Sequence, residues 1–378
     1  MLSKNVTRNS IAALFTIALV ASCSTSSNVG APTGSSNAKA PLKVAFIFDT
    51  PVTDGSFSQL AFESMKQAES HFGNKVQVSY QANTPGEPAV GPVVKRFVDE
   101  GNAIVFLNSS GYDTYILPIA KANSNVQFFQ FQSPVIQANY RSYDTNIGEA
   151  SYITGLMLGR ASKTGRIGFV SSFPFPGILT QINGVALGAQ AVNPNATVTV
   201  NFLSTFADPS KEIQAAQSLV NGGADALVDD QIGPSVCLEA ERLNVPCVAN
   251  TLVNGPSYGG KTYLTDFRFN WVSQFEKIIQ DKLDGRTPSG DLFFGWQQGA
   301  AAIGPLGPSY DTWVDAKTRS LIADKEKGLA DGSFKFYRGP VYDQSGTLRV
   351  QQGQTLTDEQ ILKIDWLVKG VVGRTSAG

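Results

Sequence analysis

The sequence predicts an α/β protein with two similar parallel-sheet lobes, joined by a hinge that leaves a cleft between them. Short apolar runs typical of strands alternate with longer amphipathic runs typical of helices, which indicates βαβ units and therefore parallel sheets. The second half of the chain repeats the order of the first half without repeating its sequence. With 378 residues, the chain is long enough for two or three hydrophobic cores.

The first lobe is predicted from a regular series of strands and helices. The segment SQLAFESMKQAESHF illustrates the helices, because its apolar residues recur at three- and four-residue spacing. The expected strands are residues 43–48, 75–81, 103–108 and 126–132, and the expected helices are residues 58–72, 89–101 and 113–123.

A long helix over residues 148–162 follows, and the series then restarts as a second lobe. In this lobe the expected strands are residues 166–172, 197–203, 224–230 and 246–250, and the expected helices are residues 178–192, 209–223 and 235–243.

The pattern becomes irregular after Val253, where strands over 262–269 and 293–304 flank a helix over 271–285. A helix over 314–332 precedes a tail with a hairpin-like DQSG and a helix capped by Thr357, so we expect the tail to pack back onto a lobe. The predicted boundaries are 42–145 plus about 262–287 for lobe 1, and 146–258 plus about 290–373 for lobe 2.

The N-terminus reads as a leader that is separate from the fold. Lys4 and Arg8 precede an apolar run too short to span a bilayer, and small residues then lead to Cys23. We interpret residues 1–23 as a lipoprotein signal peptide with a lipidated Cys23, and the alternative is plain cleavage beside an incidental cysteine. Residues 24–41 are small and polar, which predicts a flexible tether.

Two further cysteines, Cys237 and Cys247, form a possible disulfide pair in an extracytoplasmic protein. Cys237 lies near the start of a predicted helix and Cys247 on the strand after it, which would place them at opposite ends of that unit. Bridging requires closely spaced Cα atoms. The sequence therefore leaves both states of the pair open.

The sequence does not read as an enzyme, a metalloprotein or a nucleic-acid binder. The net charge is −1, no basic run could neutralise phosphates, and no HExxH, CxxC, GxSxG or Walker pattern occurs. The single histidine, His71, falls late in a helix, away from strand ends. The acid pairs Asp229–Asp230 and Asp49 with Asp54 suit hydrogen-bond recognition better than catalysis. We expect no cofactor and no metal.

Aromatic and polar residues gather where the predicted strands end, which is where open α/β sheets bind ligands. Asp54 and Phe57 in FIFDTPVTDGSFSQ follow the first strand, although Asp54 or Ser56 could instead cap the next helix. Aromatic plates with a few fixed polar groups suit a flat heterocycle. The candidates from this pattern are Asp49, Asp54, Phe57, Gln132, Phe173, Phe206 and Trp296.

The chain resembles the basic membrane protein (BMP) family, PnrA-like substrate-binding lipoproteins of ABC transporters, from about Leu42 to Gly373. The resemblance rests on four segments: TDGSFSQ, GEASYITGLMLGRASKTGRIGFVSS, STFADPSKEIQAAQSLVNGGADALVDD and the tail from GPVYDQSGTLRV to LTDEQILKIDWLVKGVVG. The resemblance implies the type I periplasmic-binding-protein fold, with the ligand in the interlobe cleft, and purine nucleosides or bare purines as ligands.

The resemblance also implies site residues at matched positions. Phe57 stands at the family's stacking phenylalanine, and Ser58 replaces an asparagine. Asp49 and Phe206 match an acid and an aromatic, Gln132 replaces an aspartate, and Thr251 lies where the family has a ribose-binding acid. Because residue 251 is neutral, we expect a free base, or another flat heterocycle, to bind at least as tightly as the matching nucleoside.

These observations predict a solute-binding lipoprotein that captures a small polar heterocycle, such as a nucleobase or nucleoside, by lobe closure. Its expected partners are the permease and ATPase of an ABC importer and, through Cys23, the extracytoplasmic face of the membrane; we expect a monomer that binds no nucleic acid. The alternatives are a sensory lipoprotein that signals to a membrane receptor without transport, and an extracytoplasmic hydrolase.

Overall fold

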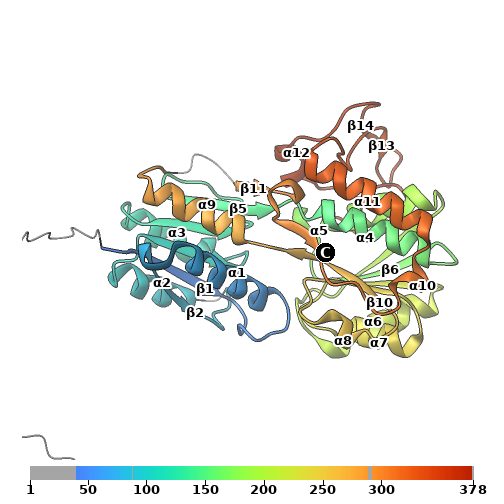
Figure 1. The fold of residues 1–378 in the computed structure, drawn as a ribbon, viewed down its shortest axis with the longest axis horizontal. Coiled ribbons are helices and arrows are strands. Elements are labelled where there is room, and N and C mark those ends of the chain that lie inside the picture. The colour runs from blue at the N-terminus through green and yellow to red at the C-terminus, as the bar shows by residue number, and fades with distance from the viewer. Residues whose placement is uncertain (1–39, 87, 288–291, 377–378) are drawn as a thin grey trace, which may run out of the picture. The chain divides into compact units, whose positions relative to one another are not determined.

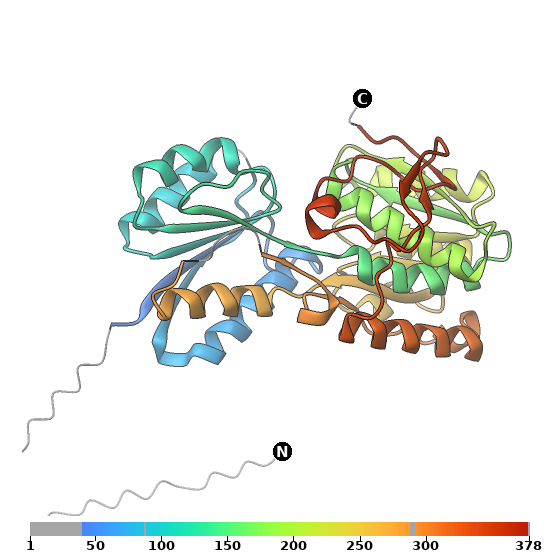
Figure 2. The same ribbon diagram turned by 90° about the horizontal axis from the view of Figure 1, so that it is seen from above.

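The computed structural model describes residues 40–86, 88–287 and 292–376. The expected signal peptide, Cys23 and nearly all of the expected tether lie outside these residues. Within them the predicted α/β fold is confirmed, because two mainly parallel sheets each carry helices on both faces (Figures 1 and 2).

The first sheet has the strand order β11-β5-β4-β3-β1-β2, and all of its pairings are parallel. Its strands are β1 (Leu42–Phe48), β2 (Val76–Gln81), β3 (Ile104–Asn108), β4 (Gln127–Phe131), β5 (Tyr140–Thr145) and β11 (Leu292–Phe294). Its helices are α1 (Phe57–Phe72), α2 (Val90–Asp99), α3 (Asp113–Ala122) and α9 (Val272–Leu283).

Strand β1 shows why this sheet is covered on both faces. Phe46 and Phe48 join the core of α1 and α9, whereas Ala45 and Ile47 join the core of α2 and α3. Successive strand residues point to opposite faces. A continuous apolar run such as VAFIF therefore needs a helical layer on each side.

The second sheet has the order β12-β10-β9-β8-β6-β7-β15, in which only the β10–β12 pairing is antiparallel within the described residues. Its strands are β6 (Arg166–Ser171), β7 (Thr197–Phe202), β8 (Ala226–Asp229), β9 (Cys247–Asn250), β10 (Tyr263–Phe269), β12 (Ala301–Ile303) and β15 (Val371–Val372). Helices α4 (Gly148–Ala161) and α5 (Pro176–Val192) pack in one core, and α6 (Pro209–Asn221) and α7 (Ser235–Leu243) in the other.

Helices α4 and α5 pack with their backbones in close approach. A Cβ added at Gly155 would lie 2.3 Å from the Val185 carbonyl oxygen, and one added at Gly188 would lie 2.1 Å from that of Tyr152. Only glycine allows two helix backbones to come this close. The buried run of α4 therefore provides a fixed support beneath the second sheet.

The chain crosses between the two sheets after β5, after β10 and again after β11 (Figure 1). Hydrogen bonds tie the crossing segments together, because the Asn146 amide donates to the Phe294 carbonyl at 2.8 Å and the Asn270 amide to that of Ala300 at 2.8 Å. These joints form the hinge region of the two lobes.

The expected lobe boundaries differ from the crossings in two places. Residues 262–287 were expected in lobe 1, but β10 pairs with β9 in the second sheet and only α9 returns to the first. Conversely, β11 pairs with β5 in the first sheet, although residues after about 290 were expected in lobe 2. The almost entirely buried run YLTDFRF fits an inner strand, whereas the three-residue β11 suits a sheet edge.

The tail packs against the second lobe. β15 pairs with β7, and the Asn183 side chain on α5 bonds to the Trp366 carbonyl at 3.0 Å and the Val368 amide at 2.9 Å. Thr357 caps its helix as predicted, with its hydroxyl accepting from the Gln360 amide. The remaining elements are η1 (Gly73–Lys75), α8 (Gly255–Tyr258), η2 (Trp296–Gln298), α10 (Tyr310–Trp313), α11 (Ala316–Asp331), α12 (Asp358–Leu362), β13 (Val341–Tyr342) and β14 (Leu348–Val350).

Cys237 and Cys247 form a disulfide, with their Cα atoms 5.5 Å apart. The expectation that they lie at opposite ends of their unit is wrong. Helix α7 has only nine residues and β9 only four, so the unit is too short to separate them. The bridge joins α7 to the sheet that it covers.

None of the helices in the described part of the chain has the length and apolar character needed to cross a bilayer.

Candidate functional site

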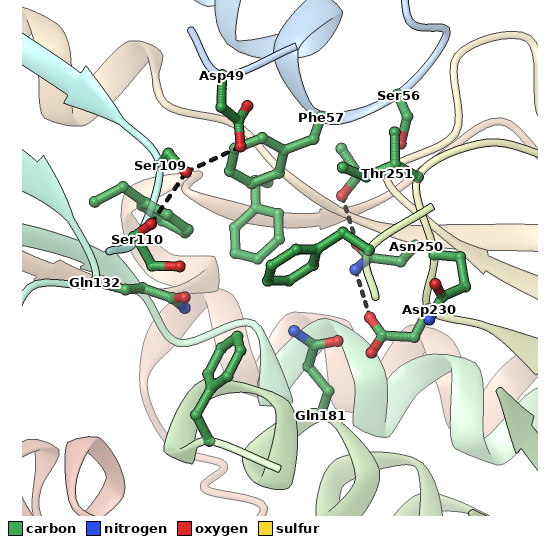
Figure 3. A pocket seen from close by; sticks show the side chains of 16 residues that line it. Asp49, Ser56, Phe57, Ser109, Ser110, Gln132, Gln181, Asp230, Asn250 and Thr251 are labelled. Carbon is green, nitrogen blue, oxygen red and sulfur yellow. Dashed lines mark hydrogen bonds between the residues drawn. The ribbon is translucent and has the colours of Figure 1, made fainter. Parts of the chain in front are cut away.

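A cavity of about 650 Å³, its open mouth included, lies between the two sheets at the carboxyl ends of their strands (Figure 3). The residues that line it come from both lobes: Asp49, Ser56, Phe57, Ser109, Ser110, Phe131, Gln132, Phe175, Gln181, Phe206, Asp230, Gln231, Ile232, Asn250, Thr251 and Phe269.

Five of the predicted site residues line this cavity: Asp49, Phe57, Gln132, Phe206 and Thr251. Strand ends bring Asp49, Gln132 and Thr251 there, because they directly follow β1, β4 and β9. Gln132 and Thr251 both have positive φ, at 55° and 52°, so the chain turns sharply as it leaves each strand.

The Asp49 carboxylate is held by two hydroxyl groups. It accepts from the Ser58 hydroxyl at 3.1 Å and from the Ser109 hydroxyl at 2.9 Å. Burial raises the pKa of Asp49, and these hydrogen bonds oppose that rise. Ser58 itself does not line the cavity, so its place in the site is to hold Asp49.

Asp54 stands outside the cavity lining, and its carboxylate caps helix α1. One oxygen accepts from the Ser56 amide at 2.8 Å and the Gln59 amide at 3.1 Å, and the other from the Ser58 amide at 3.0 Å. These are the free N–H groups of a helix start. Of the two interpretations of Asp54, the geometry supports capping.

Phe173 and Trp296 also lie outside the cavity lining. The Phe173 ring packs 5.1 Å from that of Phe206, which does line the cavity. Trp296 lies at the crossing after β11, where its backbone amide donates to the Glu149 carboxylate at 2.6 Å. It therefore belongs to the hinge region.

Aromatic rings reach the cavity from both lobes. Phe57 packs among Phe131, Phe269 and Trp271, with ring centroids 5.5, 5.8 and 4.9 Å away. From the second lobe come Phe175 and Phe206, and Phe206 is 43% exposed. Such rings offer flat apolar surface to a planar ligand.

Asp230 and Asn250, which were not among the predicted site residues, form a polar pair in the cavity (Figure 3). Asp230 accepts from the Asn250 side-chain amide at 2.7 Å and from the Ser171 hydroxyl at 2.6 Å. Burial raises the pKa of Asp230 to about 7. The acids Asp229–Asp230 at a strand end gave a sequence signal for this residue, but that signal could not tell which of the two faces the cavity.

Two glutamine side chains, also missed, leave amide atoms without a hydrogen-bond partner among the described residues. These atoms are Oε1 of Gln181 and both Oε1 and Nε2 of Gln231. The two residues are only 2% and 4% exposed, and both line the cavity. Gln181 lies within the largely apolar helix α5, where no sequence pattern marks it.

No Lys, Arg or His side chain is among the described residues that line the cavity. The nearby acid Asp266 is already paired, because Arg268 contacts both its oxygens at 2.7 and 2.6 Å and the Tyr263 hydroxyl donates to it at 2.7 Å. The site thus offers rings, amides, hydroxyls and two carboxylates. This set can bind a flat polar molecule that carries no negative charge.

The described residues contain no group of three or more His, Cys, Asp or Glu side chains placed to hold a metal ion.

Comparison with known proteins shows a family and individual relatives. Residues 42–327 match the family model of PnrA-like ABC transporter substrate-binding proteins. A purine-binding protein of Brucella abortus is 25% identical over 340 residues, which cover 89% of this chain and 95% of that protein. An ABC transporter nucleoside-binding protein of Lactococcus lactis is 25% identical over 250 residues, covering 64% and 70%.

Among solved structures, an ABC transporter solute-binding protein from Conexibacter woesei superposes with a TM-score of 0.64 at 20% identity. The match covers 78% of this chain and 98% of that protein, and it shows a shared two-lobed fold.

Proposed function

The chain belongs to the PnrA-like family of ABC transporter substrate-binding proteins, and from this premise we propose that it binds a flat nitrogen heterocycle of the nucleobase class. One observation carries the proposal: the cavity presents aromatic rings from both lobes together with amide, hydroxyl and carboxylate groups, and the described lining has no cation. The relatives named purine-binding and nucleoside-binding support the same ligand class.

The lining argues against phosphorylated or carboxylated ligands. An anion in this cavity would face Asp49 and Asp230 without a basic side chain in the described lining to neutralise it. Burying an unpaired charge is strongly unfavourable. The substrate is therefore a neutral or cationic ring compound, not a nucleotide.

The polar groups around Thr251 favour a free base over its riboside. Asp230, Asn250 and Thr251 are bonded to one another, since the Thr251 hydroxyl donates to the Asn250 side-chain oxygen at 2.6 Å and Asn250 donates to Asp230. A ribose would have to compete with these bonds, so we expect a base to bind at least as tightly as its riboside.

Calorimetric titration of ligand-stripped protein with adenine, xanthine and their ribosides tests this function. Binding of a base at micromolar affinity or better supports it. Absence of binding to every compound contradicts the ligand class. A riboside that binds more than tenfold tighter than its base would contradict only the base preference and would indicate that Asp230 holds the sugar.

The proposed role in the cell is capture for import. Closure of the lobes buries the ligand, and the closed form is the one that the permease recognises. Lipidation at Cys23 would hold the protein on the extracytoplasmic face of the membrane, close to the permease.

A further inference from the structure

Gln181 carries a buried amide oxygen with no hydrogen-bond partner among the described residues. It lies in helix α5 and is 2% exposed. Figure 3 shows its side chain pointing into the cavity, with the ends of Gln181 and Asp230 directed toward each other. An amide oxygen in this position can accept a hydrogen bond from a ligand in the cavity.

The unpaired Gln181 oxygen lowers the stability of the folded protein unless a bound molecule donates a hydrogen bond to it. A buried acceptor without a partner destabilises the folded protein, because it has lost its hydrogen bonds to water. The neighbours Leu179 and Ile182 on the same helix are buried and apolar, and a side chain of that kind would avoid the cost. We therefore expect a ligand to supply the missing donor.

The groups beside Gln181 are acceptors as well. Each carboxylate oxygen of Asp230 accepts one bond from the protein, and an oxygen of this kind has two lone pairs. Gln231 adds an amide oxygen and an amide nitrogen, both without a partner among the described residues. Among these atoms of the second lobe, acceptors therefore outnumber donors.

We propose that Gln181 is a specificity-determining residue that selects heterocycles with an exocyclic amino group, such as aminopurines, over the unsubstituted ring. This inference rests on the proposed function. An amino group has two hydrogens, so it can donate to the Gln181 oxygen and to Asp230 at once. Purine lacks this group, and its single ring N–H can donate to only one of the two oxygens.

The experiment compares purine, adenine and 2-aminopurine by calorimetric titration of the ligand-stripped full chain and its Gln181→Met variant. In the wild type, at least one amino compound should bind tenfold or more tighter than purine. In Gln181→Met, which keeps the length but removes the acceptor, this preference should fall below threefold while purine binding changes less than threefold.

Two further variants separate specificity from folding. Gln181→Glu keeps an acceptor and should retain the amino preference. Gln190→Met, on the same helix, is the matched control, because its amide donates to the Ala196 and Lys369 carbonyls at 3.3 and 2.8 Å. It should lower Tm without changing selectivity, whereas Gln181→Met should leave Tm of the empty protein unchanged or higher.

The inference is overturned if the wild type binds purine as tightly as both amino compounds, or if Gln181→Met keeps the full preference. In either case purine binding would still support the proposed function. If none of the three compounds binds the wild type, the proposed ligand class itself is contradicted, and the inference with it.

Discussion

Phe57 has two roles at once, because its ring lines the cavity and also packs in a cluster with Phe131, Phe269 and Trp271. Stacking of a base on an aromatic side chain is worth roughly 1–3 kcal/mol. Phe57→Ala should therefore weaken binding of a base by about ten- to a hundredfold. It should also lower Tm, because it removes part of the cluster.

The matched control for Phe57 is Phe62→Ala on the same helix. Phe62 packs against Phe48 and Tyr80, outside the cavity lining. This variant should lower Tm and leave the affinity within threefold of the wild type. Equal losses of affinity in both variants, measured by calorimetry, would show that Phe57 acts only through stability.

Asp230 should make the empty protein less stable as the pH rises. Its folded-state pKa is about 7 because the carboxyl is buried, and its unfolded pKa is about 3.9. Between these values the folded state holds more protons than the unfolded state, so the free energy of unfolding falls from about pH 4 to pH 7 and is level above. Asp230→Asn cannot titrate, so this variant loses that part of the slope.

The measurement is Tm of ligand-stripped wild type and Asp230→Asn at pH 5, 6, 7 and 8. The Tm of the variant minus that of the wild type should grow from pH 5 to pH 7 and then stay constant. Burial also raises the pKa of Asp49 and Asp229, so the variant keeps some slope of the same sign. Parallel curves would refute the contribution of Asp230.

Of the individual side chains in the site, the sequence predicted only some. Strand ends pointed to Asp49, Gln132 and Thr251 because residues after parallel strands meet at one sheet edge. The pattern could not separate Asp49, which faces the cavity, from Asp54, which caps α1. Gln181 was missed because a polar residue within an apolar helix carries no signal until its direction is known.

The elements were more predictable than the side chains. Apolar runs such as KVAFIF and amphipathic runs such as SQLAFESMKQAESHF correspond to β1 and α1, because their burial requires those periods. The lobe that each late element joins was not predictable in this way. Strand β10 reads as a strand in either sheet, and only its pairing with β9 and β12 places it in the second.

The Cys237–Cys247 disulfide was also not predictable from the order of the elements alone. The order of α7 and β9 was predicted, but whether Cys237 reaches Cys247 depends on how short both elements are. Boundaries set by a left-handed Asn244 after α7 and by the four residues of β9 decide the distance. Element lengths are the least certain part of a sequence prediction.

The whole protein is proposed to act at a membrane through Cys23, and Cys23→Ser tests this. A single thioether-linked lipid anchor cannot form on serine, so the variant should move from the membrane fraction to the soluble or secreted fraction. Immunoblots of fractionated cells measure the shift, and heterocycle affinity of the purified variant should match that of wild type purified without its leader. An unchanged distribution would rule out Cys23 as the anchor.

Because the chain crosses between the lobes, the first sheet can be completed only late in synthesis. The first sheet lacks its edge strand until residues 292–294 have been made, although its other strands end at Thr145. At about 5–20 residues per second, a ribosome needs on the order of 7–30 s to cover that interval. An incomplete first lobe must wait for that time with the β5 edge unpaired and the face that α9 later covers still bare. The unpaired β5 edge is thus open to wrong pairings until residues 292–294 arrive to cover it.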